Sequence, residues 1–239
     1  MKNQPFSYNP FPLGKLKQEF ARPEIEQLRE LGYKFHDHRD IVAIFEEKVA
    51  KFTGAPYAVA VDCCTHGLFL ALRYLLHCVP ELGESMIIIP QHTYLSIPQL
   101  IQQAGFGYTF GFKDWEGAYQ LEPFDIWDAA LRWKNGMYQQ GTTMVLSFQI
   151  KKRIPIGRGG MILTDDKDAA DWMRLASYDG RDLKTPYFLP WHLKMEGYHY
   201  YMTPEDAARG ILLMDKITEE GDTGSWQNYP NLTDYEFFK

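Results

Sequence analysis

Short runs rich in valine and isoleucine alternate with longer segments of helical periodicity along this chain of 239 residues. The clearest runs are Tyr-Ala-Val-Ala-Val at residues 57–61 and Met-Ile-Ile-Ile-Pro at residues 86–90. They lack the polar alternation of a strand with one wet face, so they predict strands that are buried on both faces. The alternation as a whole predicts an α/β domain whose mainly parallel central sheet is flanked by helices.

The helical segments are predicted from apolar spacing and from end signals. Within residues 40–53 the apolar side chains recur at helical spacing, and Gly54 marks the C-terminal end. Thr203 and Pro204, followed by two acids, are typical of a helix start. Further strands are expected at residues 107–112, 124–127, 143–148 and 160–164, and further helices at residues 23–31, 68–78, 98–104 and 168–177.

Composition limits the class of protein and its partners. Hydrophobic residues make up 45% and charged residues 23%, as in an ordinary globular protein, and the net charge of −6 disfavours nucleic acid as a partner. No run approaches the roughly 20 apolar residues that cross a membrane, and the N-terminus lacks the apolar core of a signal peptide. Three cysteines without metal-ligand spacing or a disulfide framework fit a cytoplasmic protein with no metal site.

Two polar turns follow predicted strands, where open α/β sheets bind their ligands. Residues 62–67 lead into a helix, and a helix N-terminus offers unpaired N–H groups to a phosphate. An ordinary strand-to-helix loop capped by Thr65 explains the same residues. Residues 91–96 form the second turn, in which Tyr94 is either a ring that stacks on a planar ligand or an ordinary aromatic of the core or surface.

Lys152 and Asp128 indicate a specific chemistry. Asp128 ends the apolar run 124–127, and Lys152 ends the stretch 147–152, shortly before the glycine-rich residues 157–160. A lysine can form a Schiff base with the aldehyde of pyridoxal 5'-phosphate (PLP), and an aspartate can keep its pyridine nitrogen protonated. The alternatives are a helix cap for Asp128 and a solvated basic loop for Lys152.

Seven sequence blocks in order resemble the DegT/DnrJ/EryC1/StrS family of sugar aminotransferases, which are PLP-dependent enzymes of fold type I. The blocks span about residues 36–215. They are Asp40-Ile41-Val42 leading to Phe45-Glu46, Ala58-Val59-Ala60-Val61 followed by Thr65, Thr93-Tyr94-Leu95-Ser96, Asp128-Ala129-Ala130, Ser147-Phe148 with Lys152 five positions after the serine, Gly159-Gly160-Met161-Ile162, and Gly197 to Pro204 followed by Ala207-Ala208.

The resemblance implies a role for each matching residue. Lys152 would form the Schiff base and move the proton, Asp128 would pair with the pyridine nitrogen, and Tyr94 would stack on the ring. Lys151 competes with Lys152, but the five-residue offset from the serine favours Lys152. The other cofactor contacts, chiefly to the phosphate, would come from Cys64, Thr65, Ser147, Ala130 and His199. His199 stands where the family carries an asparagine that reaches the neighbouring subunit's phosphate, which implies a homodimer with shared active sites.

The chain differs from the family pattern mainly in its length. The segment between Phe112 and Asp125 is shorter than in the family, and Leu131, Arg158 and Tyr201 replace the family's His or Gln, Glu and Arg. We expect an arm and a helix over residues 1–35, the PLP-binding α/β domain over residues 36–215, and a tail over residues 216–239. The tail would be a vestige of a C-terminal small domain that is largely absent.

The activity implied by the resemblance is transfer of an amino group from a glutamate-like donor to a carbonyl acceptor, namely a nucleotide-linked keto-sugar. Because the substrate side is shortened, small amines and ketones remain an alternative. A dehydratase of the same family would replace the lysine with histidine, so Lys152 argues against that activity. A truncated, non-catalytic binding protein is a third possibility.

Overall fold

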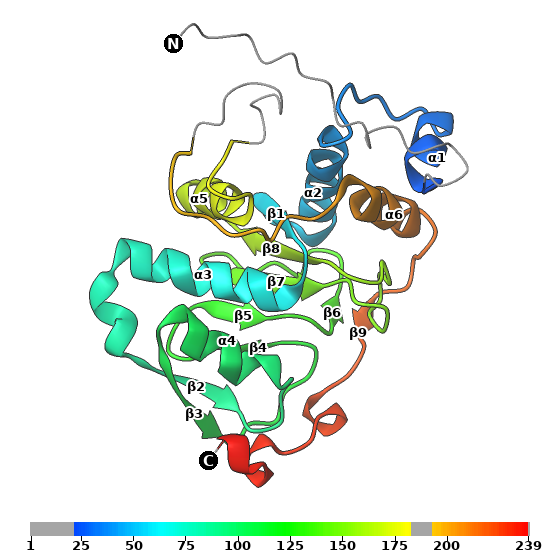
Figure 1. Cartoon of the computed structure of the whole chain (residues 1–239). Coiled ribbons are helices and arrows are strands. Elements are labelled where there is room, and N and C mark those ends of the chain that lie inside the picture. Colours follow the sequence, from blue (N-terminus) through cyan, green and yellow to red (C-terminus); the bar gives the residue numbers. More distant parts are fainter. Residues whose placement is uncertain (1–21, 183–192, 239) are drawn as a thin grey trace, which may run out of the picture.

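The computed structural model describes residues 22–182 and 193–238 of the chain (Figure 1). Most of the predicted N-terminal arm, residues 1–21, lies outside the described residues. The α-helices are α1 (Glu24–Glu30), α2 (Asp40–Thr53), α3 (Cys64–Cys78), α4 (Ser96–Ala104), α5 (Lys167–Ser177) and α6 (Pro204–Met214). The strands are β1 (Tyr57–Val61), β2 (Met86–Pro90), β3 (Gly107–Gly111), β4 (Tyr119–Gln120), β5 (Ile126–Asp128), β6 (Arg132–Trp133), β7 (Thr143–Ser147), β8 (Gly160–Thr164) and β9 (Gly221–Asp222).

The central sheet is mixed, which corrects the expectation of a mainly parallel sheet. Its strand order is β1-β8-β7-β5-β4, and β8 pairs antiparallel with both of its neighbours. The segment that joins β7 to β8 is short and contains no helix, so the chain returns beside β7 in the opposite direction. β5 and β7 are parallel, whereas the short β4 is antiparallel to β5. Outside this sheet, β2 and β3 form a parallel pair.

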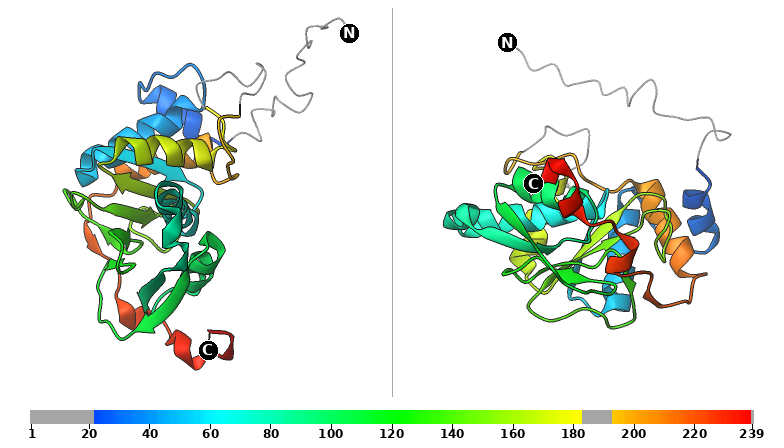
Figure 2. Two further views of the ribbon diagram at one scale, coloured as in Figure 1. Left: turned by 90° about the vertical axis from the view of Figure 1, so that its left-hand side faces the viewer. Right: turned by 90° about the horizontal axis from the view of Figure 1, so that it is seen from below.

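Both faces of the central sheet are buried, as the apolar runs predicted. Ala58 and Ala60 of β1 belong to one core cluster, whereas the alternate residues Val59 and Val61 belong to the other. The first cluster includes side chains of α1, α2 and α6, and the second includes side chains of α3, α4 and α5. Figures 1 and 2 show the sheet between these groups of helices. The α/β class is therefore confirmed.

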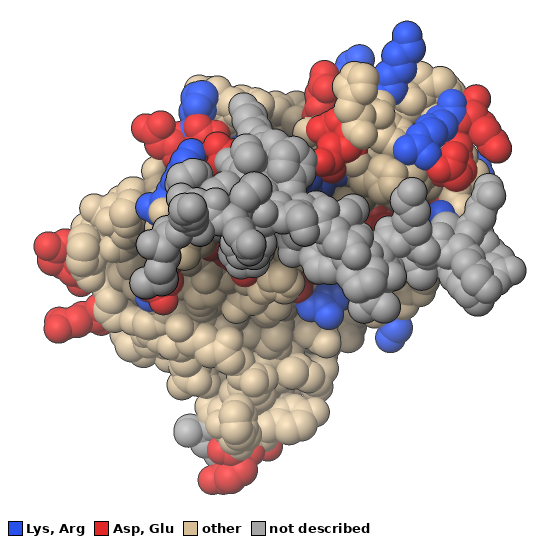
Figure 3. Space-filling model, turned by 45° about the horizontal axis from the view of Figure 1, so that its top comes forward, with Lys and Arg blue, Asp and Glu red and all other residues tan. Residues whose placement is uncertain are grey.

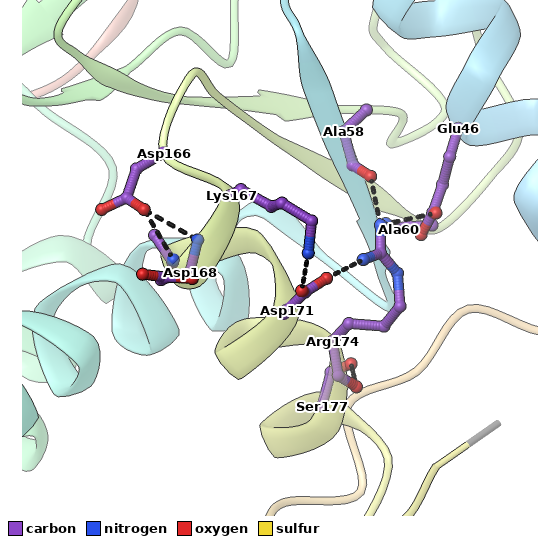
Figure 4. Close-up of polar contacts among 10 residues, drawn as sticks. Glu46, Ala58, Ala60, Asp166, Lys167, Asp168, Asp171, Arg174 and Ser177 are labelled. Carbon is purple, nitrogen blue, oxygen red and sulfur yellow. Dashed lines mark hydrogen bonds and ion pairs between the residues drawn. The ribbon is translucent and has the colours of Figure 1, made fainter.

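A partly buried ion pair ties α2, α5 and β1 together (Figure 4). One Arg174 nitrogen donates to Glu46 Oε2 at 3.0 Å and to the Ala58 carbonyl at 2.9 Å. The other Glu46 oxygen accepts the Ala60 N–H at 2.8 Å. Burial raises the pKa of Glu46, although Arg174 and the Ala60 N–H oppose that change. The carboxylate therefore needs these donors to remain ionised between the helices.

The last described segment, residues 216–238, runs from the end of α6 down the right-hand side of the molecule in Figure 1 to its lower end. It contains β9 and three short 3₁₀ helices, Trp226–Asn228, Leu232–Asp234 and Glu236–Phe238. β9 pairs with β6, and Leu232 is buried. Within these described residues there is no second α/β domain, and the segment packs against the main domain.

Charges of opposite sign lie side by side on the face shown in Figure 3. Lys and Arg side chains stand next to Asp and Glu side chains near α1. The whole chain has 25 basic and 31 acidic residues. On this face the mixture differs from the continuous basic surface of proteins that bind nucleic acid.

Replacing Gly67 with alanine should destabilise the fold, because α3 lies directly on the sheet at this position. An added Cβ would meet Val145 Cγ1 at 2.6 Å and Ile162 Cγ1 at 3.1 Å. We expect Gly67→Ala to lower the free energy of unfolding by about 1–3 kcal/mol, measured by urea denaturation.

The control is Gly83→Ala, whose Cβ would come no closer than 3.6 Å to another atom. It should change stability by less than about 0.5 kcal/mol. Equal effects of the two substitutions would contradict this account of helix packing.

Candidate active site

The ends of three strands meet at one edge of the central sheet. β1 and β7 are both antiparallel to β8, so they run in the same direction, and β5 is parallel to β7. Gly160, the first residue of β8, pairs with Val61 on one side and with Ser147 on the other. The carboxyl ends of β1, β7 and β5 therefore bring together the residues that follow them, which confirms the predicted common location at strand ends.

A cavity of about 620 Å³ opens at this edge. Its walls include seven of the eight site residues expected from the sequence, namely Cys64, Thr65, Tyr94, Asp128, Ala130, Ser147 and Lys152. The eighth, His199, is not among the lining residues. Other lining residues include Thr93, Trp115, Tyr119, Lys151, Arg158, Asn228 and Tyr229. The elements that contribute them are far apart in the sequence.

Asp128 is a buried carboxylate that accepts hydrogen bonds from its neighbours. It ends β5 and is 6% exposed. Its Oδ1 accepts the Ala130 N–H at 2.9 Å and lies 3.8 Å from the Cys64 thiol, while its Oδ2 accepts the Tyr119 hydroxyl at 2.9 Å. Burial raises the pKa of Asp128, and the Ala130 N–H and the Tyr119 hydroxyl act in the opposite direction. The site thus holds a carboxylate whose charge is only partly compensated.

Lys152 supplies a half-buried amine to the same cavity. Its backbone N–H donates to the Gln149 carbonyl at 2.8 Å, which forms a turn between β7 and β8. Burial lowers the pKa of Lys152, while the nearby charge of Asp128 raises it. Among the described residues, the amine has neither a hydrogen-bond nor an ion-pair partner. At physiological pH a larger fraction of such an amine is neutral, and therefore nucleophilic, than of an exposed lysine.

Lys151 and Lys152 differ in their surroundings. Both line the cavity, but Lys151 is exposed whereas Lys152 is half-buried. The charge of Lys151 also lowers the pKa of Lys152. These differences favour Lys152 as the reactive amine, in agreement with the offset from Ser147.

The turn at residues 62–67 begins α3 one turn earlier than the sequence predicted. The N-cap is Cys63, whose sulfur accepts the His66 N–H at 3.4 Å, rather than Thr65. Thr65 lies in the first turn, where N–H groups lack intrahelical acceptors, and its hydroxyl is 2.8 Å from that of Ser96. The Cys64 side chain points inward, 3.5 Å from the Val145 carbonyl. The helix N-terminus at the cavity suits a phosphate.

The glycine-rich turn before β8 packs against this helix start. A Cβ on Gly160 would lie 2.6 Å from Cys63 C and Cys64 N, so the two backbones could not approach as closely with any other residue. Gly159 has a φ of 133°, a conformation that favours glycine. Between Gly157 and Gly159, Arg158 reaches the rim of the cavity.

Asp62, His66 and Arg158 form a polar cluster beside the cavity. Asp62 Oδ1 lies 2.6 Å from His66 Nδ1, and Asp62 Oδ2 accepts an Arg158 nitrogen at 2.6 Å. Asp62, Cys63 and His66 place potential metal-ligand atoms within 4.8 Å of one another, a cluster that their sequence spacing did not suggest. Because both Asp62 oxygens already accept hydrogen bonds from the protein, these pairs account for the arrangement.

His199 lies outside the cavity. Its Nδ1 is 3.1 Å from Asp179 Oδ1, its ring packs edge-on against Tyr201, and its side chain is 70% exposed. The contact to a neighbouring subunit's phosphate stays a prediction. The exposure leaves the imidazole accessible from outside the subunit.

Tyr119, Trp115 and Tyr229 are functional candidates that the sequence did not reveal. Tyr119 is buried, and its hydroxyl donates to Asp128 Oδ2. The same hydroxyl oxygen lies 2.5 Å from the Thr93 hydroxyl oxygen. Tyr119 belongs to the two-residue strand β4, which is too short for a recognisable pattern. Its register opposite Asp128 is set by tertiary pairing. Trp115 and Tyr229 come from loops that meet only in the folded chain.

The residues around the cavity fit PLP. An unpartnered amine can form a covalent bond with its aldehyde, a buried carboxylate can pair with its protonated pyridine nitrogen, and a helix N-terminus can bind its phosphate. Tyr94 is 54% exposed at the cavity wall, so its ring is free to lie against a planar ligand. Ser147 adds a hydroxyl at the end of β7.

His66 should contribute a pH-dependent part of the stability. Burial lowers its pKa, but hydrogen bonds to Asp62 and Cys63 outweigh burial and raise it from 6.5 to about 9. Because the folded-state pKa is the higher one, the stabilisation is fully present below pH 6.5 and is lost as the pH rises through about 9. At pH 6, His66→Gln should lower the free energy of unfolding by about 1–3 kcal/mol.

Urea denaturation between pH 6 and pH 9.5 measures this difference. The matched control is His77→Gln at the exposed end of the same helix, which should change stability by less than about 0.5 kcal/mol. A loss of stability in His66→Gln that stays constant over this range would contradict the assignment.

Comparisons with known proteins agree with the geometry. The family model described as the DegT/DnrJ/EryC1/StrS aminotransferase family matches residues 23–122 and 133–223. GDP-perosamine synthase of Caulobacter vibrioides is 37% identical over 79 residues, which are 33% of this chain and 20% of that protein. The spore coat polysaccharide biosynthesis protein SpsC of Bacillus subtilis is 28% identical over 179 residues, covering 57% of this chain and 45% of that protein. The chain thus spans less than half the length of these two relatives.

Solved structures show the same fold. AtS13 from Actinomadura melliaura has a TM-score of 0.65 at 21% identity, and the sugar aminotransferase CalS13 from Micromonospora echinospora has a TM-score of 0.62 at 17% identity. In both cases the match covers 81% of this chain and 64% of the other chain. No described helix is long and apolar enough to cross a membrane. The family model covers most of the sequence, and the chain belongs to the DegT/DnrJ/EryC1/StrS aminotransferase family.

Proposed function

We propose that this protein is a PLP-dependent aminotransferase that moves an amino group from a glutamate-like or small amine donor to a carbonyl acceptor. The observation that carries the proposal is the pairing of Lys152 with Asp128 in one cavity. The lysine amine is half-buried and unpartnered among the described residues, and its pKa is lowered by burial and raised by the charge of Asp128. Such an amine is poised to bond to an aldehyde.

Each residue of the cavity has a distinct part in the proposed reaction. When bound, PLP would supply an electron sink for the substrate carbon that carries the amino group. Asp128 would hold a proton on the pyridine nitrogen, since a buried carboxylate attracts a cation more strongly than an exposed one does. Lys152 Nζ would take the proton from the substrate carbon and return it. Thr65 and Ser147 would orient the phosphate with their hydroxyls and with the start of α3.

The acceptor we propose is a nucleotide-linked keto-sugar. Relatives in sequence and in structure carry names from sugar chemistry, among them GDP-perosamine synthase and the sugar aminotransferase CalS13. A structure of GDP-4-keto-6-deoxymannose-3-dehydratase shares the fold at 17% identity, so the fold is compatible with two reactions. Because the family resemblance associates the dehydratase with a histidine at this position, Lys152 favours amino transfer.

We further propose a cytoplasmic homodimer with shared active sites. The exposed imidazole of His199 lies outside its own cavity and is accessible to a second subunit. Its residue position is the one from which the family resemblance expects a contact across the dimer. Small amines and ketones are the second candidate substrates, since the segment between Phe112 and Asp125 is short. A protein that binds PLP without catalysis is the outcome expected if turnover is absent.

The attachment point of the cofactor tests the proposal directly. The protein is mixed with PLP, reduced with borohydride and digested, and the modified peptide is identified by mass spectrometry. We expect the phosphopyridoxyl group on Lys152, because the neutral fraction of its amine is increased by burial. Lys152→Ala should lose the modification and the yellow colour.

Lys151→Ala is the matched control, since it removes the neighbouring exposed lysine and should keep the modification at Lys152. Modification at Lys151 in the native protein would overturn the assignment of the lysine. A native protein that takes up no PLP would overturn the proposed function.

The substitution Asp128→Asn should weaken PLP binding and leave the stability of the fold nearly unchanged. Loss of a charge-assisted hydrogen bond of about 1.5–3 kcal/mol should weaken PLP binding tenfold or more, measured by absorbance titration. Burial raises the folded-state pKa of Asp128. At pH values above that pKa the ionised carboxylate therefore lowers the free energy of unfolding. Above neutral pH the unfolding free energy of the cofactor-free variant should therefore not fall by more than about 1 kcal/mol. A variant that binds PLP normally would contradict the role of Asp128.

A further inference from the structure

The tail of the chain forms one wall of the cavity. We call residues 223–232 the strap; this segment follows β9, and its course is shown in Figures 1 and 2. Three of its residues, Thr223, Asn228 and Tyr229, line the cavity. Asp128, Lys152 and the start of α3 line the same cavity.

Hydrogen bonds to two loops hold the strap in place. The Tyr229 carbonyl accepts His92 Nδ1–H at 2.9 Å, and the Leu232 N–H donates to the Gln91 carbonyl at 2.9 Å. The Trp226 N–H donates to the Trp115 carbonyl at 3.1 Å. Leu232 is 2% exposed, so an apolar anchor accompanies these bonds. The strap is therefore a fixed wall with a defined register.

Tyr229 presents a neutral hydroxyl group and an aromatic face to the cavity. Its ring lies 5.6 Å from that of Trp115 and 6.5 Å from that of Tyr94. Burial raises the pKa of Tyr229, and the nearby Asp128 and Cys64 raise it further, so the phenol stays protonated at neutral pH. Among the described residues, this hydroxyl has no hydrogen-bond partner. A donor next to an aromatic surface is thus left for a ligand.

Asn228 adds a second neutral donor. Its Oδ1 accepts the Ser225 N–H at 2.7 Å, which fixes the side chain and leaves the amide NH₂ without a partner among the described residues. Thr223 donates its hydroxyl to the Leu131 carbonyl at 3.2 Å. The charged groups of the cavity, Lys151, Lys152, Arg158 and Asp128, come from other elements. The side chains that the strap contributes are therefore all uncharged.

We propose that the strap binds the uncharged, hydroxylated part of the carbonyl acceptor, and that Tyr229 determines specificity for it. The phenol O–H would donate to an acceptor oxygen while the rings of Tyr229 and Trp115 pack against its C–H groups. An aromatic body with a polar tip suits a ring compound that carries hydroxyl groups. A small number of placed donors in a mainly apolar wall fixes the orientation of such a ligand. The inference rests on the proposed function, since it assigns a substrate to the same cavity.

A strap of this kind would make the enzyme prefer sugar-like acceptors to simple ketones. A site built to hydrogen-bond a substrate oxygen discriminates against analogues that lack it, because its own polar groups are then left unpaired. An apolar ketone such as cyclohexanone leaves both Tyr229 and Asn228 without partners. A hydroxylated keto-sugar satisfies them.

The test compares Tyr229→Phe with Tyr235→Phe in the full chain. Tyr235 lies just beyond the strap, is 50% exposed and does not line the cavity, so it is a matched control. Each protein is loaded with PLP and supplied with glutamate as amino donor, and kcat/KM is measured with GDP-4-keto-6-deoxymannose and with cyclohexanone. Borohydride modification of Lys152 after PLP loading confirms that each variant folds and binds the cofactor.

We expect the native protein to prefer the keto-sugar and Tyr229→Phe to lose about tenfold in kcat/KM for it, with cyclohexanone unaffected. Tyr235→Phe should match the native protein. Equal losses for both acceptors, or no loss in Tyr229→Phe, would overturn the inference alone. No turnover of the keto-sugar by a native protein that is modified at Lys152 would overturn the inference and the proposed acceptor, but not the proposed PLP chemistry. A native protein that takes up no PLP would overturn the proposed function as well.

Discussion

The pairing of β8 between β1 and β7 is the constraint on which the rest of the site depends. Gly160 faces Val61 and Ser147 at once, so the ends of β1 and β7 are held at the same level of the sheet. The lack of a side chain at Gly160 also allows the backbone of Cys63 and Cys64 to approach. The start of α3, the hydroxyl of Ser147 and the loop that carries Lys152 are therefore positioned together by one backbone contact.

The charged groups that line the cavity come from outside the strap, and the strap contributes only uncharged side chains. Burial raises the pKa of Asp128 and lowers that of Lys152, so burial disfavours the charged form of each group. A bound cation next to the carboxylate and an aldehyde next to the amine would each satisfy a group that the protein leaves incompletely compensated. At the strap, uncharged donors and aromatic rings replace the charges. This division is the physical basis for assigning cofactor and acceptor to different walls.

Particular elements show how far a sequence prediction reaches here. β1, β2 and β8 were predicted at their observed bounds from their runs of Val, Ile and Met. β1 and β8 are buried on both faces, but β2 is not, because Met86 and Ile88 on one of its faces are exposed. The sheet was predicted to be mainly parallel, which is wrong, because apolar runs carry no information on strand direction. The segment between β7 and β8, which contains Lys152, is short and has no crossover helix, and this feature indicates an antiparallel β8. The sequence prediction did not use it. Cys64 was placed before the helix, since a Cys-Thr-His start has no strong N-terminal signal.

The sequence by itself determined the α/β class and the family blocks, because these depend on local patterns. It also predicted Lys152, Asp128, Thr65 and Ser147 as site residues, from strand-end positions and from the family resemblance. Only the tertiary structure decided what surrounds them. Tyr119 reaches Asp128 through β4 pairing, and Tyr229 enters the cavity because His92 and Gln91 bind the strap. Such contacts join segments up to 137 positions apart. Their geometry follows from the packing of the whole chain, which no local pattern encodes.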